Sequence, residues 1–548
     1  MLTEKAKNSA FWEKVRTKES YKRFVDELLG IWEKDCSGDI PACKYTEYVL
    51  FDQTGSRTEY EKSYFTRRRA LNASALLSLI YPNEEKYYTK LCDVIWAILD
   101  EYNWTLPAHI GNFKDNVVDR IDLFAAETGF ALSEIDYIFE DRLPALIRSR
   151  ISAEVDRRII KSYMSERREW WEKCTNNWAA VCVGSVGITF MYQRPDLFFS
   201  VYPRIKETLA CFLRGFPEDG ICLEGFGYWH YGFGFYLCFA DMLREFSKNE
   251  IDCLSEEKIK EIVKYPQRMY IDGGTTVSFS DGSMSGRWHI GILHYLKKRF
   301  PGEIRLPDHK YSYTNDNCGR WGLHLRAILW FDEELEQDTS KDEYFDYAPA
   351  SQWLIRKSSH YAFAAKGGDN GEPHNHNDLG SFIVAKNGEQ ILCDPGAGKY
   401  SKQYFNKERY TFFKTCSRGH SVPIIDGRYQ KDGRDFSAES SFDGEVFTVR
   451  FERAYGIPSL TELTRRFSFD NDTVTVSDTF EFDGKALPVT ERFISRFPAE
   501  ITDEGVYTGG LVLIAEGEVS ISQIEGFWCI DYVIPSEKKQ FTLRIISQ

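Results

Sequence analysis

The chain has no apolar stretch of membrane-spanning length, and its first residues, 1–7, are charged and polar, without the apolar core of a signal peptide. It also has no excess of basic residues, because 69 Lys and Arg stand against 83 Asp and Glu and give a net charge of −14. Nucleic acids and anionic membranes favour a basic protein surface. We therefore expect neither a nucleic-acid partner nor a membrane partner.

Cysteine pairs are missing as well. The 13 cysteines are an odd number, and no two of them have the C-x-x-C spacing. Cysteines scattered in this way are typical of buried thiols in a reducing compartment. We expect a cytoplasmic protein, with an exported protein that has lost its signal segment as the alternative.

The chain is long enough, at 548 residues, for more than one domain, and its hydrophobic period changes once along its length. Over roughly the first 330 residues, apolar side chains recur at helical spacing. A Pro82-Asn83 break separates the first two periodic segments, which indicates a helical hairpin. The segments expected to be helical are 67–79, 91–98, 117–139, 145–163 and 231–246. These patterns predict a helical domain over residues 1–340.

Beyond an acidic stretch at 332–346, apolar residues alternate with polar ones, as in half-buried strands. Asn387-Gly388 fits the positive-φ positions of a type I′ turn between the apolar runs 382–386 and 390–393. Residues 466–482 form a second strand-like segment, with a turn at 470–472. These patterns predict an antiparallel β-sandwich domain over residues 341–548.

Two histidines, His374 and His376, directly precede the first predicted hairpin. In an extended chain, side chains two residues apart point the same way. Such a pair can bind a metal, act in acid–base catalysis, or only form hydrogen bonds on a sheet face. Further along, Asp394 and His420 could join His376 in a three-ligand set of the kind that binds zinc.

Two segments of the helical half, 175–178 and 222–231, are dense in polar and aromatic side chains. Taken alone, each is explained by helix caps and packing aromatics. Their presence together with the histidine motif favours a shared active site.

The whole pattern resembles the heparinase II/III-like polysaccharide lyases, a superfamily that includes heparin, heparan and alginate lyases. The resemblance implies an α+β multidomain protein, with an incomplete α/α toroid followed by an antiparallel β-sandwich and a cleft between them. It also implies an acidic oligosaccharide or polysaccharide as substrate. The segments that carry it are 104–109, 122–128, 176–178, 224–231, 374–382, 387–388, 394–400 and His420.

The resemblance further implies roles in a β-elimination, which removes the C5 proton of a uronate and expels the O4 leaving group. Asn177 would stabilise charge on the C6 carboxylate, Tyr228 would act as acid and possibly also as base, and His374 would act as base or second neutraliser. Each has a structural alternative: a helix cap for Asn177, a packing aromatic for Tyr228, and a hydrogen-bonding histidine for His374. The substrate-binding candidates are His109, Trp178, Tyr231 and Tyr410, the last chosen from a loop that also contains Tyr400 and Tyr404.

By the same resemblance, His376, Asp394 and His420 would hold one divalent metal, most plausibly zinc, with a structural role. The alternative is a hydrogen-bonded cluster of the same residues without metal.

One residue departs from the family pattern, because Trp178 follows Asn177 where several members have histidine. That histidine is a candidate base, so its absence shifts proton abstraction toward Tyr228 or His374. Two other functions remain open. One is a glycoside hydrolase that uses Glu224 and Asp281 as its two carboxylates. The other is a glycan-binding protein without catalysis.

Overall fold

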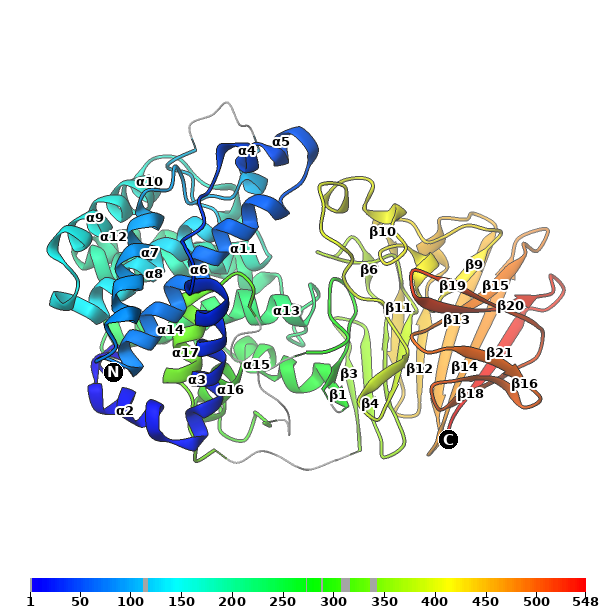
Figure 1. Ribbon diagram of the computed structural model, residues 1–548. Coiled ribbons are helices and arrows are strands. Elements are labelled where there is room, and N and C mark those ends of the chain that lie inside the picture. The colour runs from blue at the N-terminus through cyan, green and yellow to red at the C-terminus, as the bar shows by residue number, and fades with distance from the viewer. Residues whose placement is uncertain (1, 112–116, 273, 287–288, 307–315, 336–342) are drawn as a thin grey trace.

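The computed structural model describes residues 2–548 except 112–116, 273, 287–288, 307–315 and 336–342 (Figure 1). A helical half that contains the amino terminus lies beside a β half that contains the carboxyl terminus. The predicted fold class, a helical region followed by antiparallel sheets, is confirmed. The predicted domain boundary between residues 340 and 341 lies outside the described residues.

The helical half consists mostly of antiparallel neighbours joined by short loops (Figure 1). Helix α11 is apolar on all sides and almost fully buried, as expected for a helix that other helices surround. It packs against α8, α12 and α14. The helices are α1 Leu2–Lys7, α2 Ser9–Thr17, α3 Glu19–Ile31, α4 Tyr45–Tyr48, α5 Leu50–Thr54, α6 Thr58–Ile80, α7 Glu85–Leu99, α8 Leu123–Phe139, α9 Ala145–Val155, α10 Lys161–Met164, α11 Asn177–Gln193, α12 Pro195–Arg214, α13 Phe226–Tyr228, α14 Gly234–Phe246, α15 Glu257–Met269, α16 Ile290–Arg299 and α17 Trp321–Leu329.

The β half contains two large sheets in which neighbouring strands are antiparallel. One has the order β11-β12-β13-β14-β21-β18-β17-β16, and the other has the order β19-β20-β15-β8-β7-β5-β4-β3, with β9 paired to β15. Strands β6 and β10 form a separate pair. The strands are β3 Tyr344–Ala348, β4 Trp353–Lys357, β5 Ala362–Lys366, β6 Asp369–Asn370, β7 Phe382–Lys386, β8 Glu389–Leu392, β9 Pro423–Ile425, β10 Gly433–Ser437, β11 Glu439–Phe442, β12 Val446–Arg450, β13 Leu460–Phe469, β14 Thr473–Phe482, β15 Val489–Ser495, β16 Ala499–Thr502, β17 Gly505–Thr508, β18 Leu511–Ala515, β19 Glu518–Ile524, β20 Phe527–Ile534 and β21 Gln540–Ser547.

Both hairpins predicted from the sequence are confirmed. Strands β7 and β8 pair around Asn387 and Gly388, whose φ angles of 53° and 82° suit a type I′ turn. Strands β13 and β14 pair in register, with Val474 and Val476 pointing into the core between the sheets.

Strands β4, β5 and β7 are buried on both faces. Along each strand, alternate side chains belong to the core of the helical half and to the core between the two sheets. In β5, for example, Ala364 packs toward the helices and Phe363 toward the sheet that contains β13 and β14. The sheet that contains β4, β5 and β7 is therefore the middle layer of the molecule, which attaches the two halves through an apolar contact.

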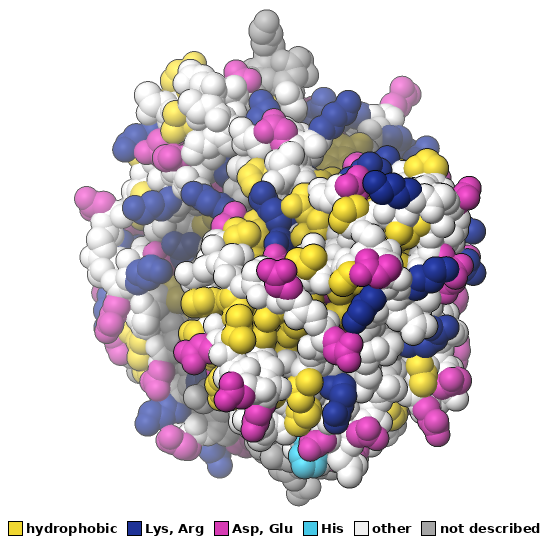
Figure 2. All heavy atoms as spheres, turned by 90° about the vertical axis from the view of Figure 1, so that its right-hand side faces the viewer, with side chains coloured by type: hydrophobic (Ala, Val, Ile, Leu, Met, Phe, Trp, Pro, Cys, Tyr) yellow, Lys and Arg dark blue, Asp and Glu magenta, His cyan; other side chains and the backbone are white. Residues whose placement is uncertain are grey.

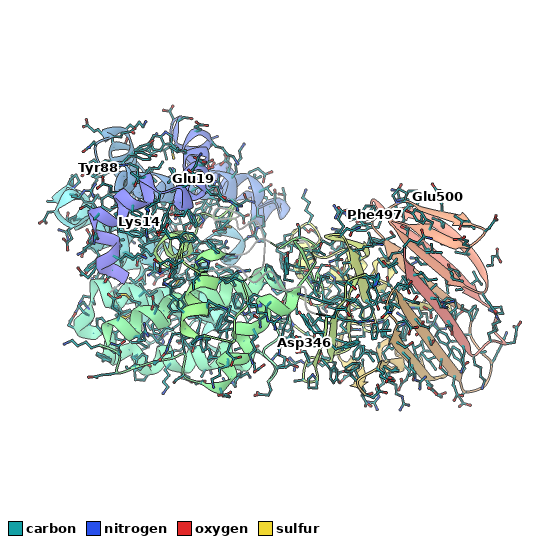
Figure 3. The ribbon with its side chains drawn as sticks, turned by 90° about the horizontal axis from the view of Figure 1, so that it is seen from below. Lys14, Glu19, Tyr88, Asp346, Phe497 and Glu500 are labelled. Atoms are coloured by element: carbon teal, nitrogen blue, oxygen red, sulfur yellow. The ribbon has the colours of Figure 1, made fainter. Side chains whose placement is uncertain are left out.

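Polar contacts reinforce this junction. Arg268 of α15 forms an ion pair of 3.0 Å with Asp346 of β3, which Figure 3 labels where the two halves meet. A short hairpin that the sequence did not predict, β1 Tyr270–Asp272 and β2 Thr275–Thr276, follows α15 and contacts β4, β5 and β7 of the β half. It leads into a buried loop that carries Asp281 to the junction.

All thirteen cysteines lie in the described part of the chain and are free thiols, eight of them buried. Among the described helices, none is both long and apolar enough to cross a membrane. On the end face of the β half, basic and acidic side chains are interspersed rather than gathered by sign (Figure 2).

Candidate active site

Three loops meet at the junction, and glycines allow their backbones to approach closely. Gly225 has a φ of 111°, and a Cβ atom there would lie 3.1 Å from the backbone of Gly282. Gly396 has a φ of 60°, and a Cβ atom there would lie 2.5 Å from the Gly282 carbonyl oxygen. Only glycine tolerates both the conformation and the contact. These approaches bring together Glu224, Asp281 and Asp394, the residues that precede each glycine-containing turn.

Asn177 is the first residue of α11, and it is 3% exposed. The cap of this helix is Asn176, whose side chain accepts a hydrogen bond from the backbone of Trp178. The Asn177 side chain is therefore not needed as a cap, and its Oδ1 atom is buried without a hydrogen-bond partner among the described residues. The backbone N–H of Asn177 donates to Oε1 of Glu224 at 3.2 Å.

Tyr228 ends the one-turn helix α13 and lies against His374 of the β half. The two rings are stacked, with centroids 4.3 Å apart and an interplanar angle of 29°. The Tyr228 hydroxyl lies 2.6 Å from the hydroxyl of Tyr400. Burial raises the pKa of Tyr228 well above its usual value, so its phenol is protonated at neutral pH.

His374 does not lie in a strand. Its φ of 58° places it in the left-handed region, in the loop between β6 and β7. The expectation that His374 and His376 point the same way from an extended chain is wrong in its geometry, because the chain turns here. The two imidazoles nevertheless reach the same group: His374 Nδ1 lies 2.8 Å from Asp281 Oδ2, and His376 Nε2 lies 3.1 Å from Asp281 Oδ1.

Asp281 is the most heavily engaged side chain of the site. Besides the two histidines, Arg409 donates to its Oδ1 atom at 2.9 Å, Tyr404 donates to the same oxygen, and Tyr400 lies 3.3 Å from Oδ2. Burial alone would raise the pKa of Asp281, but the hydrogen bonds from the histidines and the charge of Arg409 hold it well below its usual value. Asp281 is therefore a permanent carboxylate.

The pKa of Glu224 is shifted in the opposite direction from that of Asp281. Burial raises its pKa, although the nearby His374 opposes this. Its Oε2 atom lies 3.6 Å from His374 Nε2 and is buried without a hydrogen-bond partner among the described residues. Together with Asn177 Oδ1, it leaves two buried polar atoms unpaired at one place, and such atoms are rare in folded proteins.

Two of the predicted substrate-binding residues form an aromatic group beside Asn177. The rings of His109 and Trp178 make an edge contact with centroids 4.8 Å apart, and Trp178 packs on Trp170 at 4.7 Å. His109 is held by Asp122, 2.7 Å from its Nδ1 atom. Trp170 is 58% exposed, so this aromatic group reaches the solvent beside Asn177.

The other two predicted substrate-binding residues are held by protein groups. Tyr410 donates to Oδ1 of Asn375 at 2.6 Å, which fixes the loop that carries His374. Tyr231 donates to Glu127, and the Arg320 guanidinium lies 3.8 Å from the centre of its ring. Neither tyrosine forms a side-chain hydrogen bond with Tyr228 among the described residues.

We expect Glu127→Gln to stabilise the protein increasingly as the pH rises from 5 to 8. Burial raises the pKa of Glu127 to about 7, although Arg320 and Tyr231 lower it. Between the ordinary glutamate pKa and about 7, the folded state keeps a proton that the unfolded state has lost, so stability falls as the pH rises through this window. Glu127→Gln lacks this loss of folding stability with rising pH, which is on the order of 3 kcal/mol.

Urea unfolding of both proteins at several pH values measures the effect, with Glu504→Gln at an exposed position as control. An advantage of the variant that is the same at pH 5 and pH 8 would show that Glu127 ionises near its ordinary pKa.

The predicted metal ligands His376, Asp394 and His420 lie together and are fully buried. One ligand atom from each lies within 4.8 Å of the others, so this group could hold a metal ion. His376 Nδ1 is buried without a partner among the described residues. His420 Nδ1 faces Asp394 at 3.0 Å, and its Nε2 atom donates to the Lys414 carbonyl oxygen at 2.9 Å.

This arrangement fits a metal in two ways. Each imidazole has its second nitrogen bonded to an acceptor, Asp281 for His376 and a carbonyl for His420, which is how ligand histidines are normally oriented. Burial lowers the pKa of His376, which keeps it neutral as a ligand must be. Burial opposes protonation of His420 as well, but the neighbouring Asp394 carboxylate raises its pKa.

From the sequence, Asp281 and Glu224 were predicted only as the two carboxylates of a glycoside hydrolase. Arg409 was not predicted to belong to the site. It placed Tyr400 and Tyr404 in the right loop but preferred Tyr410. A signal was present in the segment 400–410, where five ring or guanidinium side chains fall between the two metal-ligand candidates Asp394 and His420. Which of them reach Asp281 depends on how the loop folds.

Comparison with known proteins agrees with this architecture. Residues 341–504 match the family described as Heparinase II/III-like, C-terminal. A crystal structure of heparinase III superposes with a TM-score of 0.63 at 12% identity, covering 98% of this chain and 86% of that one. Heparan sulfate lyase HepC from Pedobacter heparinus gives 0.56 at 12% identity, covering 98% and 92%.

A xanthan lyase from Paenibacillus also superposes, with a TM-score of 0.56 at 10% identity, and the match covers all of this chain and 59% of that one. No curated protein matches the chain in sequence. The chain thus has the fold of heparinase III and other polysaccharide lyases, and its β half contains a heparinase II/III-like C-terminal domain.

Proposed function

We propose that the protein is a carbon–oxygen lyase that cleaves a uronate-containing oligosaccharide or polysaccharide by β-elimination and leaves a 4,5-unsaturated uronate. The observation that carries this proposal is the contact of Tyr228 with His374 beside the unpaired polar atoms of Asn177 and Glu224. This set contains a protonated phenol, an imidazole, and an asparagine whose side-chain N–H groups can donate to a carboxylate.

The elimination needs three balanced events. The Nε2 atom of His374 takes the C5 proton, the C5–H electron pair forms the C4=C5 double bond, and the C4–O4 bond breaks with its pair going to O4, which the Tyr228 hydroxyl protonates. The raised pKa of Tyr228 keeps its phenol protonated, as an acid must be before it acts. After each turnover His374 releases the C5 proton to water and Tyr228 regains a proton, for which Tyr400, 2.6 Å from the Tyr228 hydroxyl, is placed as a relay.

Charge builds up on the C6 carboxylate in the transition state. The side-chain amide of Asn177 can donate to it. Glu224 can donate only in its protonated form, and burial raises its pKa in that direction. Both groups are buried, and hydrogen bonds are stronger where water is excluded. An acidic substrate is thus consistent with a protein whose net charge is −14, since the local site supplies donors.

The geometry disfavours the glycoside hydrolase that uses Glu224 and Asp281. His374 lies between these two carboxyl groups, with Nε2 toward Glu224 and Nδ1 toward Asp281. A glycosidic oxygen cannot occupy the same space. Asp281 also has its oxygens engaged by protein donors, so it offers little basicity to an attacking water.

The absorbance of the product tests the proposal. We expect incubation with at least one of hyaluronan, chondroitin, heparan or alginate, or with oligosaccharides from them, to produce the ultraviolet absorbance of a conjugated enoate. Hydrolysis gives reducing ends without this absorbance, and a binding protein gives neither. If polymers and short oligomers alike gave new reducing ends without this absorbance, the protein would be a hydrolase and not a lyase.

We also propose that His376, Asp394 and His420 hold one zinc ion that stabilises the loops around the site rather than touching the substrate. Removing zinc should lower the melting temperature, because an ion present at about 1,000 times its Kd contributes about 4 kcal/mol of stability. Elemental analysis and thermal unfolding, before and after chelation and again after adding zinc, measure this. His420→Ala should abolish the response, whereas His360→Ala, at an exposed position, should keep it. An unchanged melting temperature in metal-free protein contradicts the proposal.

A further inference from the structure

Asp281 stands between the catalytic histidine and the candidate metal site, and neither the fold nor the reaction by itself gives it a role. We propose that Asp281 is a positioning residue whose one carboxylate fixes the tautomers of both His374 and His376. The consequence is that His374 presents a free Nε2 atom to the substrate while His376 presents a free Nδ1 atom to the metal. The part that concerns His374 rests on the proposed lyase function.

The tautomers follow from hydrogen-bond chemistry. A carboxylate can only accept, so the imidazole nitrogens that face it carry the protons. Nδ1 of His374 lies 2.8 Å from Oδ2, and Nε2 of His376 lies 3.1 Å from Oδ1. In a neutral imidazole the other nitrogen then has its lone pair free. For His374 this is the nitrogen toward Glu224, and for His376 it is the buried nitrogen without a partner among the described residues.

The carboxylate is itself held in place. Arg409 donates to Oδ1 and also to the carbonyl oxygens of His374 and Asn375, so one guanidinium fixes both Asp281 and the backbone of the histidine loop. Tyr404 donates to Oδ1 as well. Ser280, the residue before Asp281, has a φ of 62°, a backbone conformation that non-glycine residues hold only when their surroundings enforce it.

An amide cannot replace this carboxylate. An asparagine at position 281 has one accepting oxygen and one NH2 group that must donate. It can satisfy one histidine in the present tautomer, but the other must turn its lone pair toward the amide. Asp281→Asn therefore keeps the shape of the side chain while forcing one of the two imidazoles into the wrong tautomer.

The direct experiment reads the tautomers of the wild-type protein by nitrogen NMR. Histidine is labelled with 15N, and the His374 and His376 signals are assigned by comparison with His374→Ala and His376→Ala. We expect protonated Nδ1 in His374 and protonated Nε2 in His376. Protonated Nε2 in His374 overturns the proposal, and this result does not depend on whether any glycan is cleaved.

The variant adds two measurements. Asp281→Asn should lower kcat by ~10²–10⁴-fold with KM little changed, the loss expected when a catalytic imidazole is held in the wrong tautomer. It should also weaken zinc binding ~10–100-fold, the usual effect of losing the group that orients a ligand histidine. Zinc alone, titrated into metal-free protein, is the probe for the second effect.

Tyr404→Phe is the matched control, because it removes one hydrogen bond to the same carboxylate but leaves the carboxylate in place. It should keep both tautomers and lose less activity than Asp281→Asn. If Asp281→Asn keeps wild-type kcat and wild-type zinc affinity, or if Tyr404→Phe matches it in both losses, Asp281 is only structural. A wild-type protein without lyase activity but with the expected tautomers rejects the proposed function and leaves the positioning role standing.

Discussion

Tyr228→Phe is expected to lower kcat by ~10²–10⁴-fold while KM changes little. The substitution removes the hydroxyl that lies 2.6 Å from Tyr400 and keeps the ring that stacks on His374. Substrate binding and folding should therefore survive, whereas protonation of the O4 leaving group should not. Initial rates of enoate absorbance against substrate concentration, with the fold checked by thermal unfolding, separate kcat from KM.

A control with the same chemical change is available within the chain. Tyr163 of α10 has a buried hydroxyl without a hydrogen-bond partner among the described residues, and it lies in the helical core away from the junction. Tyr163→Phe should leave kcat unchanged. If a folded Tyr228→Phe enzyme retains near wild-type kcat, the role of acid passes to Tyr400, the tyrosine whose hydroxyl is nearest.

The fold could be predicted from the sequence because its determinants are local. The helical hairpin α6–α7 follows from apolar spacing and the Pro82-Asn83 break, and β7–β8 follows from alternation around Asn387-Gly388. Such signals are carried by residues close together in the chain. The hairpin β1–β2 was missed because it is only a few residues long and lies in a helical context.

The candidate site was predictable only where its residues occur in motifs. His376, Asp394 and His420 were grouped on that basis, and the structure brings them together. Asp281 could not be placed in the same way, because His374 and His376 lie 93 and 95 residues further along the chain. Its position depends on the close approach of three loop backbones, which no periodic pattern encodes. The preference for Tyr410 over Tyr400 failed to anticipate the Tyr228 contact for the same reason.

His374→Ala is expected to be at least as damaging as Tyr228→Phe, with a ~10²–10⁴-fold fall in kcat, because no other described imidazole lies at the same place. The other histidines near the site are placed differently: Nδ1 of His109 faces Asp122, and His376 is fully buried in the candidate metal site. Added imidazole should restore part of the activity, since the deletion leaves a space of its own size next to Glu224. His360→Ala, at an exposed position, is the control for the substitution itself.

A substrate with a better leaving group at C4 separates base from acid. It relieves the need to protonate O4, so it should rescue Tyr228→Phe and leave His374→Ala slow. A substrate deuterated at C5 adds an independent reading, because removal of the C5 proton should limit the rate in His374→Ala and give a large isotope effect. If the better leaving group rescues His374→Ala instead, His374 does not take the proton. It would then act with Asn177 and Glu224 on the carboxylate, and Tyr228 would serve as both base and acid.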